Sequence, residues 1–507
     1  MPASVRSWFP HPWREWRILD VWCFPSVIFK VFNANDANGQ VTSKWREYEL
    51  IVYVRSVFVA KSSSIAPDKI YDKSVLKPFP GFERKLHELD LNYLCNKNNI
   101  AEIEENVKRR KLNGDIKLIH ELFARIQSAE NGGEKDLLIE QLSEEALKIP
   151  NKLKPGLGDE PELMRYVGEK KTFSFSPKTF ENLTKINGIL RTEKLGHLTG
   201  RRSYFLCGAL SQLEEAIVNF TVNHLYERGF QLVSVPDILP ASVIEGCGMT
   251  TRGERNQVYR LDNQLYKTGT EWGDEICLSG TSEMALAALL AHESCSNGPI
   301  PSGELPLRIC AVSRCYRAEV SSVATERGLY RVHEFTKVEM FGACPPDESA
   351  QLANELVSIE EEILTALGLH ARVLQMGAAD LGPQAYYKVD IEAWMPGRAT
   401  SGSKEKEEEF GWGEVSSCSD CTDFQSRRLG IHYADRNGNR HLLHTVNGTA
   451  AAIPRLLIAI LETHQREDKT IEIPNALRPF MNGCDTISPS QKVIDIKPLP
   501  VSLRSRS

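Results

Sequence analysis

Five residues able to bind a nucleotide lie close together in the segment RAEVSSVATERGLYRVHEFTKVEMF, which begins at Arg317. The segment predicts two strands joined by a loop. Side chains alternate between the faces of a strand, so the even spacing of Arg331, Phe335 and Glu339 predicts that all three share one face. That face combines a guanidinium for phosphate, a ring for a base and a carboxylate acceptor. Together with Arg317 and Glu319 it is a candidate nucleotide site, with an exposed charged strand face as the alternative.

A further arginine lies in the segment HTVNGTAAAIPRLLIAILETHQ. The dipeptide Asn447-Gly448 predicts a turn, and the alanine-rich run after it predicts a helix with Pro454 near its start. Arg455 then lies in the first turns, where the helix N-terminus also favours anions. The alternative is a surface arginine on a core helix. Between the two clusters, GEVSSCSDCTDFQSRRL carries Glu414 and Ser417, whose oxygens are the ligand type of a divalent cation that bridges phosphates.

Twelve cysteines are scattered from Cys23 to Cys484 without the regular spacing of a small secreted scaffold, which indicates free thiols in a reducing compartment. Cys418 and Cys421 form the one close CxxC pair. No second pair or histidine follows at metal-ligand spacing, so we expect two thiols in a strand or loop and no zinc.

Helices are predicted on the N-terminal side of these clusters. Apolar residues recur at three-and-four spacing from Ile100 to Val107 and again from Ile116 to Ile126, and a third run spans Lys135 to Ile149. Asn113-Gly114-Asp115 separates the first two runs, and Asn131-Gly132-Gly133 precedes the third. We therefore predict an antiparallel helical hairpin whose second arm is interrupted at the paired glycines.

Prolines and glycines after residue 150 predict a linker, and strand and helix signals alternate beyond it. A helix stopping at Gly229 is followed by the short strand QLVSV, and strand-like segments recur as LPLRICAVSRCYRA, LYRVHEFTKVEMFGA, ARVLQMG and YYKVDIEAWM. The fold class predicted is α+β, with a mainly antiparallel sheet flanked by helices. Neither common glycine-rich phosphate loop occurs at a strand-to-helix junction.

The bulk composition is that of a soluble protein with two or three domains: 507 residues, 41% hydrophobic, 25% charged and a formal net charge of −6. A nucleic acid would therefore have to meet a local basic surface. No apolar run is long enough to span a bilayer, so we expect no membrane association. Residues 1–50 carry acids that a transit peptide lacks, whereas IVYVRSVFVAKSSSIA, which follows, has the composition of an organelle-targeting sequence.

Four segments in order resemble the seryl-tRNA synthetases, which are class II aminoacyl-tRNA synthetases: GTSEMALAALL, GLYRVHEFTKVEMF, GEVSSCSDCTDFQSRR and VNGTAAAIPR. The resemblance runs from about residue 70 to the C-terminus, and a helix-strand-Pro236 segment similar to motif 1 precedes the four segments. It implies an N-terminal extension at 1–66, a coiled-coil-like helical tRNA-binding arm at 67–155, a class II catalytic domain at 170–490 and a tail at 491–507.

The resemblance also implies a role for each matching residue. Arg317, Glu319 and Arg455 would be catalytic. The remaining ATP-binding positions would be Ala318, Arg331, Val332, Phe335, Glu414, Val415, Ser416 and Ser417, with Glu414 and Ser417 also holding Mg²⁺. Arg317 would in addition bind the serine carboxylate, and the other serine-binding positions would be Thr281, Ser282, Glu283, Glu339, Asn447 and Thr449.

The partners implied are L-serine, ATP, tRNA(Ser) and a second copy of the chain in a homodimer. Lys108, Arg109, Arg110 and Lys111 form a basic cluster predicted to lie near the turn of the arm and to contact tRNA, with a solvated helix end as the alternative. The short, interrupted arm and the lack of a lysine-rich C-terminal extension resemble the mitochondrial branch. The mitochondrial matrix is therefore the expected location, and the cytoplasm is the alternative.

Three positions depart from the family pattern. Glu334 stands where glutamine is usual, Ala451 replaces a larger residue, and the polar segment ATSGSKEKEEEFGW at 399–412 is an insertion that we expect to form an exposed loop. Two other functions are weighed against serine activation. One is a catalytically inactive synthetase-like paralogue that acts as a binding protein, and the other is a different class II enzyme that keeps the ATP residues.

Overall fold

The computed structural model describes residues 89–489 except 130–131, 194, 196–197, 254–255, 262–274, 320–327 and 401–409. The chain separates into two compact units, 1–75 and 76–507, and all described residues belong to the second. The predicted extension at 1–66, the start of the predicted arm at 67–88 and the predicted tail at 491–507 lie outside the described residues.

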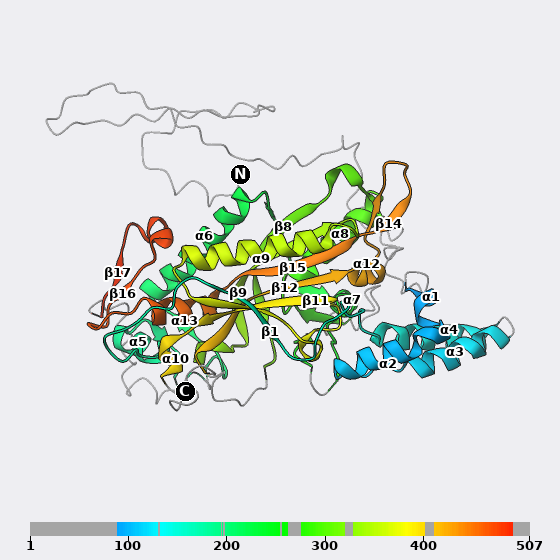
Figure 1. Cartoon of the computed structure of the whole chain (residues 1–507), viewed down its shortest axis with the longest axis horizontal. Helices are drawn as coiled ribbons and strands as arrows, with labels where there is room; N and C mark the ends of the chain where they lie inside the picture. Colours follow the sequence, from blue (N-terminus) through cyan, green and yellow to red (C-terminus); the bar gives the residue numbers. More distant parts are fainter. Residues whose placement is uncertain are drawn as a thin grey trace, which may run out of the picture. The chain divides into compact units, whose positions relative to one another are not determined.

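The centre of the fold is an eight-stranded sheet flanked by helices (Figure 1). Its pairs are antiparallel except for the last, in which β4 runs parallel to β8. The predicted antiparallel sheet is thus confirmed. In spatial order the strands are β1 (Glu162–Val167), β10 (Ala371–Gln375), β11 (Tyr387–Trp394), β12 (Trp412–Thr422), β15 (His444–Ala452), β9 (Glu334–Cys344), β8 (Leu307–Tyr316) and β4 (Gln231–Leu232).

Helices pack against both faces of the sheet, because the apolar side chains of β9 point alternately to one face and to the other. Val338 and Met340 join the core formed with α6 (Ala209–Glu227), α9 (Ser349–Ala366) and α13 (Ile453–Thr463). Phe341 and Ala343 point the other way, into the core formed with α7 (Ala241–Gly246) and α8 (Glu283–Ser296). Because Lys337 and Glu339 share the parity of Phe341, their polar side chains lie on the α8 face of the sheet.

Two details of this domain differ from the sequence prediction. Asn447-Gly448 lies in the middle of β15 and not in a turn. A Cβ at Gly448 would come within 2.9 Å of a carboxyl oxygen of Glu360 on α9. The glycine is needed for close packing and not for a turn. Residues 162–167, which precede the predicted start of the catalytic domain at 170, form the edge strand β1, because they pair with β10.

The shorter elements complete the domain. They are α5 (Phe180–Asn187), β2 (Leu190–Arg191), β3 (Phe205–Leu206), β5 (Ile238–Pro240), β6 (Ile276–Leu278), β7 (Ile300–Pro301), η8 (Gly328–Tyr330), α10 (Pro396–Ala399), α12 (Phe424–Leu429), β13 (His432–Ala434), β14 (Arg440–Leu442), β16 (Ile471–Glu472) and β17 (Thr486–Ile487). Of the predicted loop at 399–412, Ala399 ends α10 and Trp412 begins β12, and both are buried.

In the described residues before β1, four α-helices are found: α1 (Leu91–Leu94), α2 (Ile100–Arg109), α3 (Ile116–Ser128) and α4 (Gly133–Lys148). They enclose an apolar core of their own, which includes Ile103, Ile119 and Leu142. α3 packs mainly against α4 (Figure 1), so Gly132 and Gly133 lie at the connection of two paired helices and do not interrupt one arm as predicted. None of the helices in the described ranges is both long and apolar enough to cross a membrane.

Candidate active site

A pocket opens where the edges of β8, β9, β12 and β15 meet the turn at η8 and the start of α13. Almost all of the predicted ATP-binding residues line it. The wall consists of Arg317, Glu319, Tyr330, Arg331, Val332, Phe335, Lys337, Glu414, Val415, Ser416, Thr449, Ala452, Pro454 and Arg455.

The sheet register brings together side chains that are far apart in sequence. On β9, Glu339 lies opposite Ala311 of β8 and opposite Thr449 of β15. On β15, Asn447 lies opposite Ser419 of β12. Directly opposed residues share a face, so Glu339 and Thr449 project to the same side. The two segments predicted to carry the site are therefore neighbouring strands of one sheet.

The outer half of the pocket holds two arginine–carboxylate pairs. Arg331 lies 3.3 Å from Glu319, which also accepts a hydrogen bond from Gln257. Arg455 lies 3.2 Å from the Glu414 carboxylate and donates to its backbone oxygen. Burial would raise the pKa of Glu414, but Arg455 and Lys388 outweigh it and lower that pKa. Both guanidiniums lie in the pocket wall, and a guanidinium fork is suited to bind phosphate.

Aromatic rings complete the outer half. The Arg317 guanidinium lies over the Phe335 ring at 5.3 Å, and its Nε donates to the Gly280 oxygen. Arg455 and Arg398 lie over the Tyr330 ring at 4.7 and 4.4 Å. Rings and guanidiniums therefore alternate along the pocket, so a ligand with a flat base and phosphates could bind the base at a ring and the phosphates at the cations.

Behind the pocket wall, and referred to below as the inner half of the site, lies a buried polar network centred on Lys337, which itself lines the pocket. Lys337 forms an ion pair with Glu339 and donates to the Thr281 hydroxyl at 2.8 Å, and both residues of the pair are at most 5% exposed. Glu283, at the start of α8, accepts a hydrogen bond from Gln425 at 2.6 Å. Burial and then the neighbouring Glu339 raise the pKa of Glu283 to about 7. Burial likewise raises the pKa of Glu339.

A β-bulge places the predicted metal ligands on one face. Ser417 opposes Asp390 and Glu414 opposes Glu392, so Val415 is an extra residue on β12. Without it, Glu414 and Ser417, three positions apart, would point to opposite sides. Asp390 pairs with Lys388 through one carboxyl oxygen, and its other oxygen is buried without a hydrogen-bond partner in the described part of the chain.

Some predicted residues are arranged differently. Arg331 precedes β9 in the turn after η8, so it reaches the pocket from a loop and not from the strand face. Ala318 and Ser417 are not in the wall, and the Ala318 amide donates to the Gln257 oxygen. Ser282 is fully buried, and its hydroxyl meets no partner within the described ranges.

Four site residues were missed: Lys337, Gln425, Asp390 and Tyr330. Lys337 had a usable signal, because it lies two positions from both Phe335 and Glu339 and must share their face. The other three lie on a helix, a strand and a turn that meet the site only after folding, so local spacing carried no signal for them.

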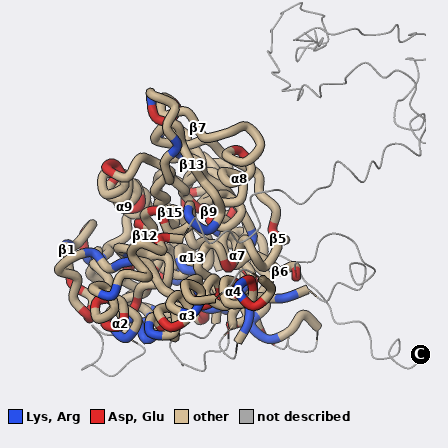
Figure 2. Tube along the Cα trace, turned by 90° about the vertical axis from the view of Figure 1, so that its right-hand side faces the viewer, with Lys and Arg blue, Asp and Glu red and all other residues tan. Residues whose placement is uncertain are grey.

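The basic cluster at 108–111 is the main correction. Arg110 is only 3% exposed and donates to the backbone oxygens of Gly382 and Ala385. Arg109 pairs with Asp159. Lys108 and Lys111 are exposed. The predicted tRNA patch therefore loses its two arginines to contacts within the protein, and Figure 2 shows acidic and basic residues interspersed along these helices.

The CxxC thiols are buried on β12, where Cys418 donates to the Ala353 oxygen and Cys421 lies 3.9 Å from Asn447. Burial raises the pKa of both thiols. Within the described parts of the chain, no cluster of three histidine, cysteine or acidic side chains suits a metal ion.

The fold and the pocket together define a class II tRNA synthetase core. The family model for the tRNA synthetase class II core domain (G, H, P, S and T) matches residues 266–464, the segment that contains every pocket residue. That model groups several amino acid specificities, so it identifies the class alone.

Individual relatives narrow the class to one family. The chain is 39% identical to a serine–tRNA ligase of Rubrobacter xylanophilus, over 70% of this chain and 78% of the relative. It is 44% identical to the mitochondrial serine–tRNA ligase of Mus musculus over 69% of this chain, and the match spans 64% of the mouse protein's length. The chain belongs to the seryl-tRNA synthetase family.

Solved structures agree with this assignment. A seryl-tRNA synthetase from Pyrococcus horikoshii complexed with ATP has a TM-score of 0.63 and 28% identity, covering 80% of this chain and 91% of that one. A cytoplasmic serine-tRNA ligase from Naegleria fowleri in complex with AMP, at 23% identity and a TM-score of 0.66, supports the fold.

Proposed function

We propose that this protein is a serine–tRNA ligase, which activates L-serine with ATP to seryl-adenylate and transfers the seryl group to the 3′ end of tRNA(Ser). The observation that carries the proposal is the inner network. Two carboxylates, Glu283 and Glu339, are buried next to a pocket lined with arginines, and only Glu339 forms an ion pair with Lys337 among the described residues.

The charge of this network favours an amino acid ligand. Lys337 is paired with Glu339, whereas the Glu283 carboxylate is hydrogen-bonded to the neutral amide of Gln425. A buried carboxylate without a counter-ion of its own is costly unless it is protonated or gains a cation. The α-ammonium group of serine supplies that cation, and Arg317 at the pocket wall binds the carboxylate at the other end of the substrate.

The serine hydroxyl is proposed to meet Glu339, Asn447 and Thr449. Glu339 and Thr449 are opposed across the β9–β15 pair, and Asn447 lies on the same strand as Thr449. A site that hydrogen-bonds a hydroxyl rejects alanine strongly, because its polar groups would stay buried and unpaired. Ser282, whose hydroxyl is buried, is proposed to shape the start of α8 and not to touch the substrate.

ATP is proposed to occupy the outer half, with adenine on Phe335 and its amino group at Glu319. Arg331 and Arg455 would hold the outer phosphates, and Arg317 the α-phosphate. Each arginine–carboxylate pair has one partly exposed member, so phosphate oxygens can take the place of the carboxylates at the guanidiniums. The relative solved with ATP supports this nucleotide.

The residues present fit a magnesium ion. Glu414 and Ser417 share a face of β12, and the Asp390 oxygen that lacks a partner among the described residues lies on the strand beside them. Hard oxygen donors are what Mg²⁺ prefers, with phosphate oxygens completing its shell. Glu414 and Ser417 would hold the ion with Asp390 in support, and a bound ion would neutralise charge on the phosphates.

The proposed reaction depends on the positioning of the substrates and on electrostatic stabilisation. The serine carboxylate attacks the α-phosphorus in line, the bond to pyrophosphate breaks, and Arg317, Arg331 and Arg455 stabilise the developing charge. The terminal ribose hydroxyl of the tRNA then attacks the carbonyl carbon of the adenylate and AMP leaves. No side-chain nucleophile takes part.

The remaining proposals concern tRNA, a second copy of the chain and the location. The helices α2–α4 are proposed as a short coiled-coil-like arm for tRNA(Ser), with Lys108 and Lys111 as its exposed cations.

A homodimer is proposed because large apolar side chains on and after α6 are exposed, including Tyr226 at 77% and Leu232 at 51%. The mitochondrial matrix is proposed as the location, since two similar curated relatives are named as mitochondrial.

The test is serine-dependent exchange of labelled pyrophosphate into ATP by the purified full chain. An inactive paralogue would bind but not exchange, whereas a different class II enzyme would exchange with another amino acid. The first alternative is not favoured, because every charged residue of the predicted site is retained and the arginines line the pocket.

A further inference from the structure

Arg110 joins the N-terminal helices to the catalytic sheet through an unusual set of partners. Its guanidinium donates to the backbone oxygens of Gly382 and Ala385 at 2.7 and 2.8 Å, to those of Asn151 and Lys152 at 3.0 and 3.1 Å, and to the Asn106 side chain at 2.9 Å. No carboxylate in the described residues forms an ion pair with it. Its charge is therefore balanced only by oxygen dipoles that point at one planar group.

Asn151 continues this joint into the sheet. Its side-chain amide donates to the backbone oxygens of Gln384 and Cys421 and to the Thr422 hydroxyl, all within 2.9 Å. Cys421 and Thr422 end β12, the strand whose other end carries Glu414. The loop at 382–385 leads directly into β11, which carries Asp390. The joint thus fixes the helices to one end of the β11–β12 pair, and Glu414 lies towards the other end.

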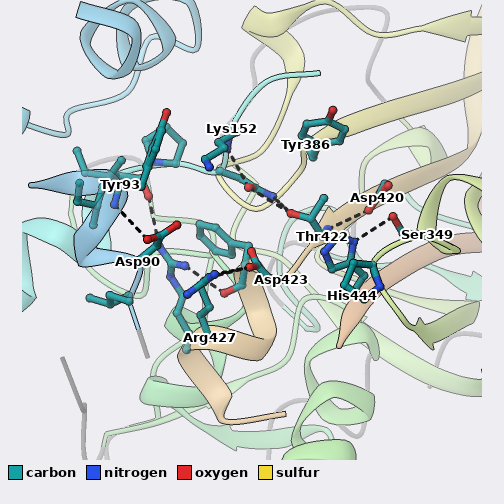
Figure 3. A pocket seen from close by; sticks show the side chains of 18 of the residues that line it. Asp90, Tyr93, Lys152, Ser349, Tyr386, Asp420, Thr422, Asp423, Arg427 and His444 are labelled. Atoms are coloured by element: carbon teal, nitrogen blue, oxygen red, sulfur yellow. Dashed lines mark hydrogen bonds and ion pairs between the residues drawn. The ribbon is translucent and has the colours of Figure 1, made fainter. Parts of the chain in front are cut away.

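A small apolar cluster that includes Leu157 and Ala385 accompanies these hydrogen bonds. The helices α1–α4 enclose a core that is separate from the two cores of the catalytic domain. Between them lies a cavity of about 510 Å³, bordered by Asp90 and Tyr93 on one side and by Asp420 and His444 on the other (Figure 3). Apolar contact is non-directional, whereas a planar guanidinium fixes its partners in angle and distance.

The cavity does not offer an obvious ligand of its own, because its charged groups already have partners. Asp423 pairs with Arg427, the Asp90 carboxylate accepts from the Tyr93 amide, and His444 contacts Ser349 (Figure 3). The cavity instead affects how firmly the helices are held against the catalytic domain. An open space beside the joint makes the orientation of the helices depend more on the directional contacts of Arg110 and Asn151, to which Arg428 adds a hydrogen bond to the Ile149 oxygen.

We propose that Arg110 and Asn151 are positioning residues that set the angle of helices α2–α4 to the catalytic sheet, so that tRNA bound along the helices delivers its 3′ end to the pocket. The inference rests on the proposed function. Serine activation occurs within the sheet and does not need the helices, so the joint should affect the transfer step and leave activation unchanged.

The experiment compares the two half-reactions in Arg110→Met, Asn151→Leu and Thr422→Val, with Arg436→Met, in an exposed turn, as the arginine-loss control. Arg110→Met and Asn151→Leu should lower the kcat for charging tRNA(Ser) by up to about a hundredfold, the size that a 1 Å misplacement can cause. Pyrophosphate exchange with serine and the KM for tRNA should stay near those of the unaltered protein. Thr422→Val removes one hydroxyl and should give the same split at smaller size.

Two results would overturn the inference. Exchange that falls in proportion to charging would mean that the joint only holds the catalytic domain together, and charging that equals the Arg436→Met control would mean that the joint does not matter. Thr422→Val and Asn151→Leu keep the test decisive where Arg110→Met fails to accumulate. Absence of exchange in the unaltered chain would instead contradict the proposed function.

Discussion

Two buried cations in this protein are compensated in opposite ways. Lys337, in the pocket, is 5% exposed and lies among the carboxylates of Glu339 and Glu283, whereas Arg110, at the base of the helices, is 3% exposed and meets only carbonyl and amide oxygens. An ammonium group between two carboxylates can share them with an incoming charge. A guanidinium held by fixed backbone oxygens has one arrangement. The surroundings of Lys337 therefore suit a ligand site, and those of Arg110 suit a rigid joint.

The largest expected effect is on the outer half of the pocket. Arg455→Ala removes a guanidinium that is proposed to stabilise the leaving phosphates, so the kcat of serine-dependent exchange should fall by about a thousandfold. Arg436→Met is the matched control. Retention of normal exchange in Arg455→Ala would show that the pocket cations do not serve phosphate.

The second prediction removes a carboxylate beside Lys337. Glu339→Gln keeps the shape of the side chain but loses its charge, so the KM for serine should rise by about 10- to 100-fold, as for the loss of a hydrogen bond to a charged group. The KM for ATP should change little. Equal changes in the KM for serine and the KM for ATP would contradict the proposal that serine binds in the inner half of the site and ATP in the outer half.

The third prediction concerns pH. The pKa of Glu283 is raised to about 7 by burial and by Glu339. Serine's ammonium group needs the deprotonated carboxylate, so kcat/KM for serine should fall by about tenfold per unit as the pH drops below 7 and level off above it. Glu283→Gln should remove this dependence along with most of the affinity. A wild-type profile that is flat from pH 5 to 8 would exclude Glu283 as the ammonium partner.

The smallest effect is expected on the exposed side of the helices. Lys108→Ala and Lys111→Ala each remove one solvated cation, so the KM for tRNA should rise a few-fold, and the salt dependence of binding should weaken by about one unit of slope for each phosphate that is no longer neutralised. Serine exchange should not change. A loss of kcat as large as that expected for Arg110→Met would erase the contrast between exposed cations and the buried joint.

The sequence predicted the catalytic sheet and the positions of the N-terminal helices, but not the contacts that join those helices to the sheet. Strands such as Leu307–Tyr316 and Glu334–Cys344 are recognisable from their local pattern, and their pairing then brings Phe335 and Glu339 to the pocket. Arg110 looked like part of a solvated basic run, since nothing near it in sequence reveals the backbone oxygens of Gly382 and Ala385, more than 270 positions away. Asn447-Gly448 was misjudged for the same reason, because Glu360 on a distant helix is what requires the glycine.

The central claim is that the carboxylates around Lys337 select serine, and pyrophosphate exchange by the purified full chain tests it most directly. The result expected is ATP formation that depends on serine and is far weaker with threonine, alanine or cysteine. Exchange with another amino acid in preference to serine, or none with any of them from a folded protein, would contradict it.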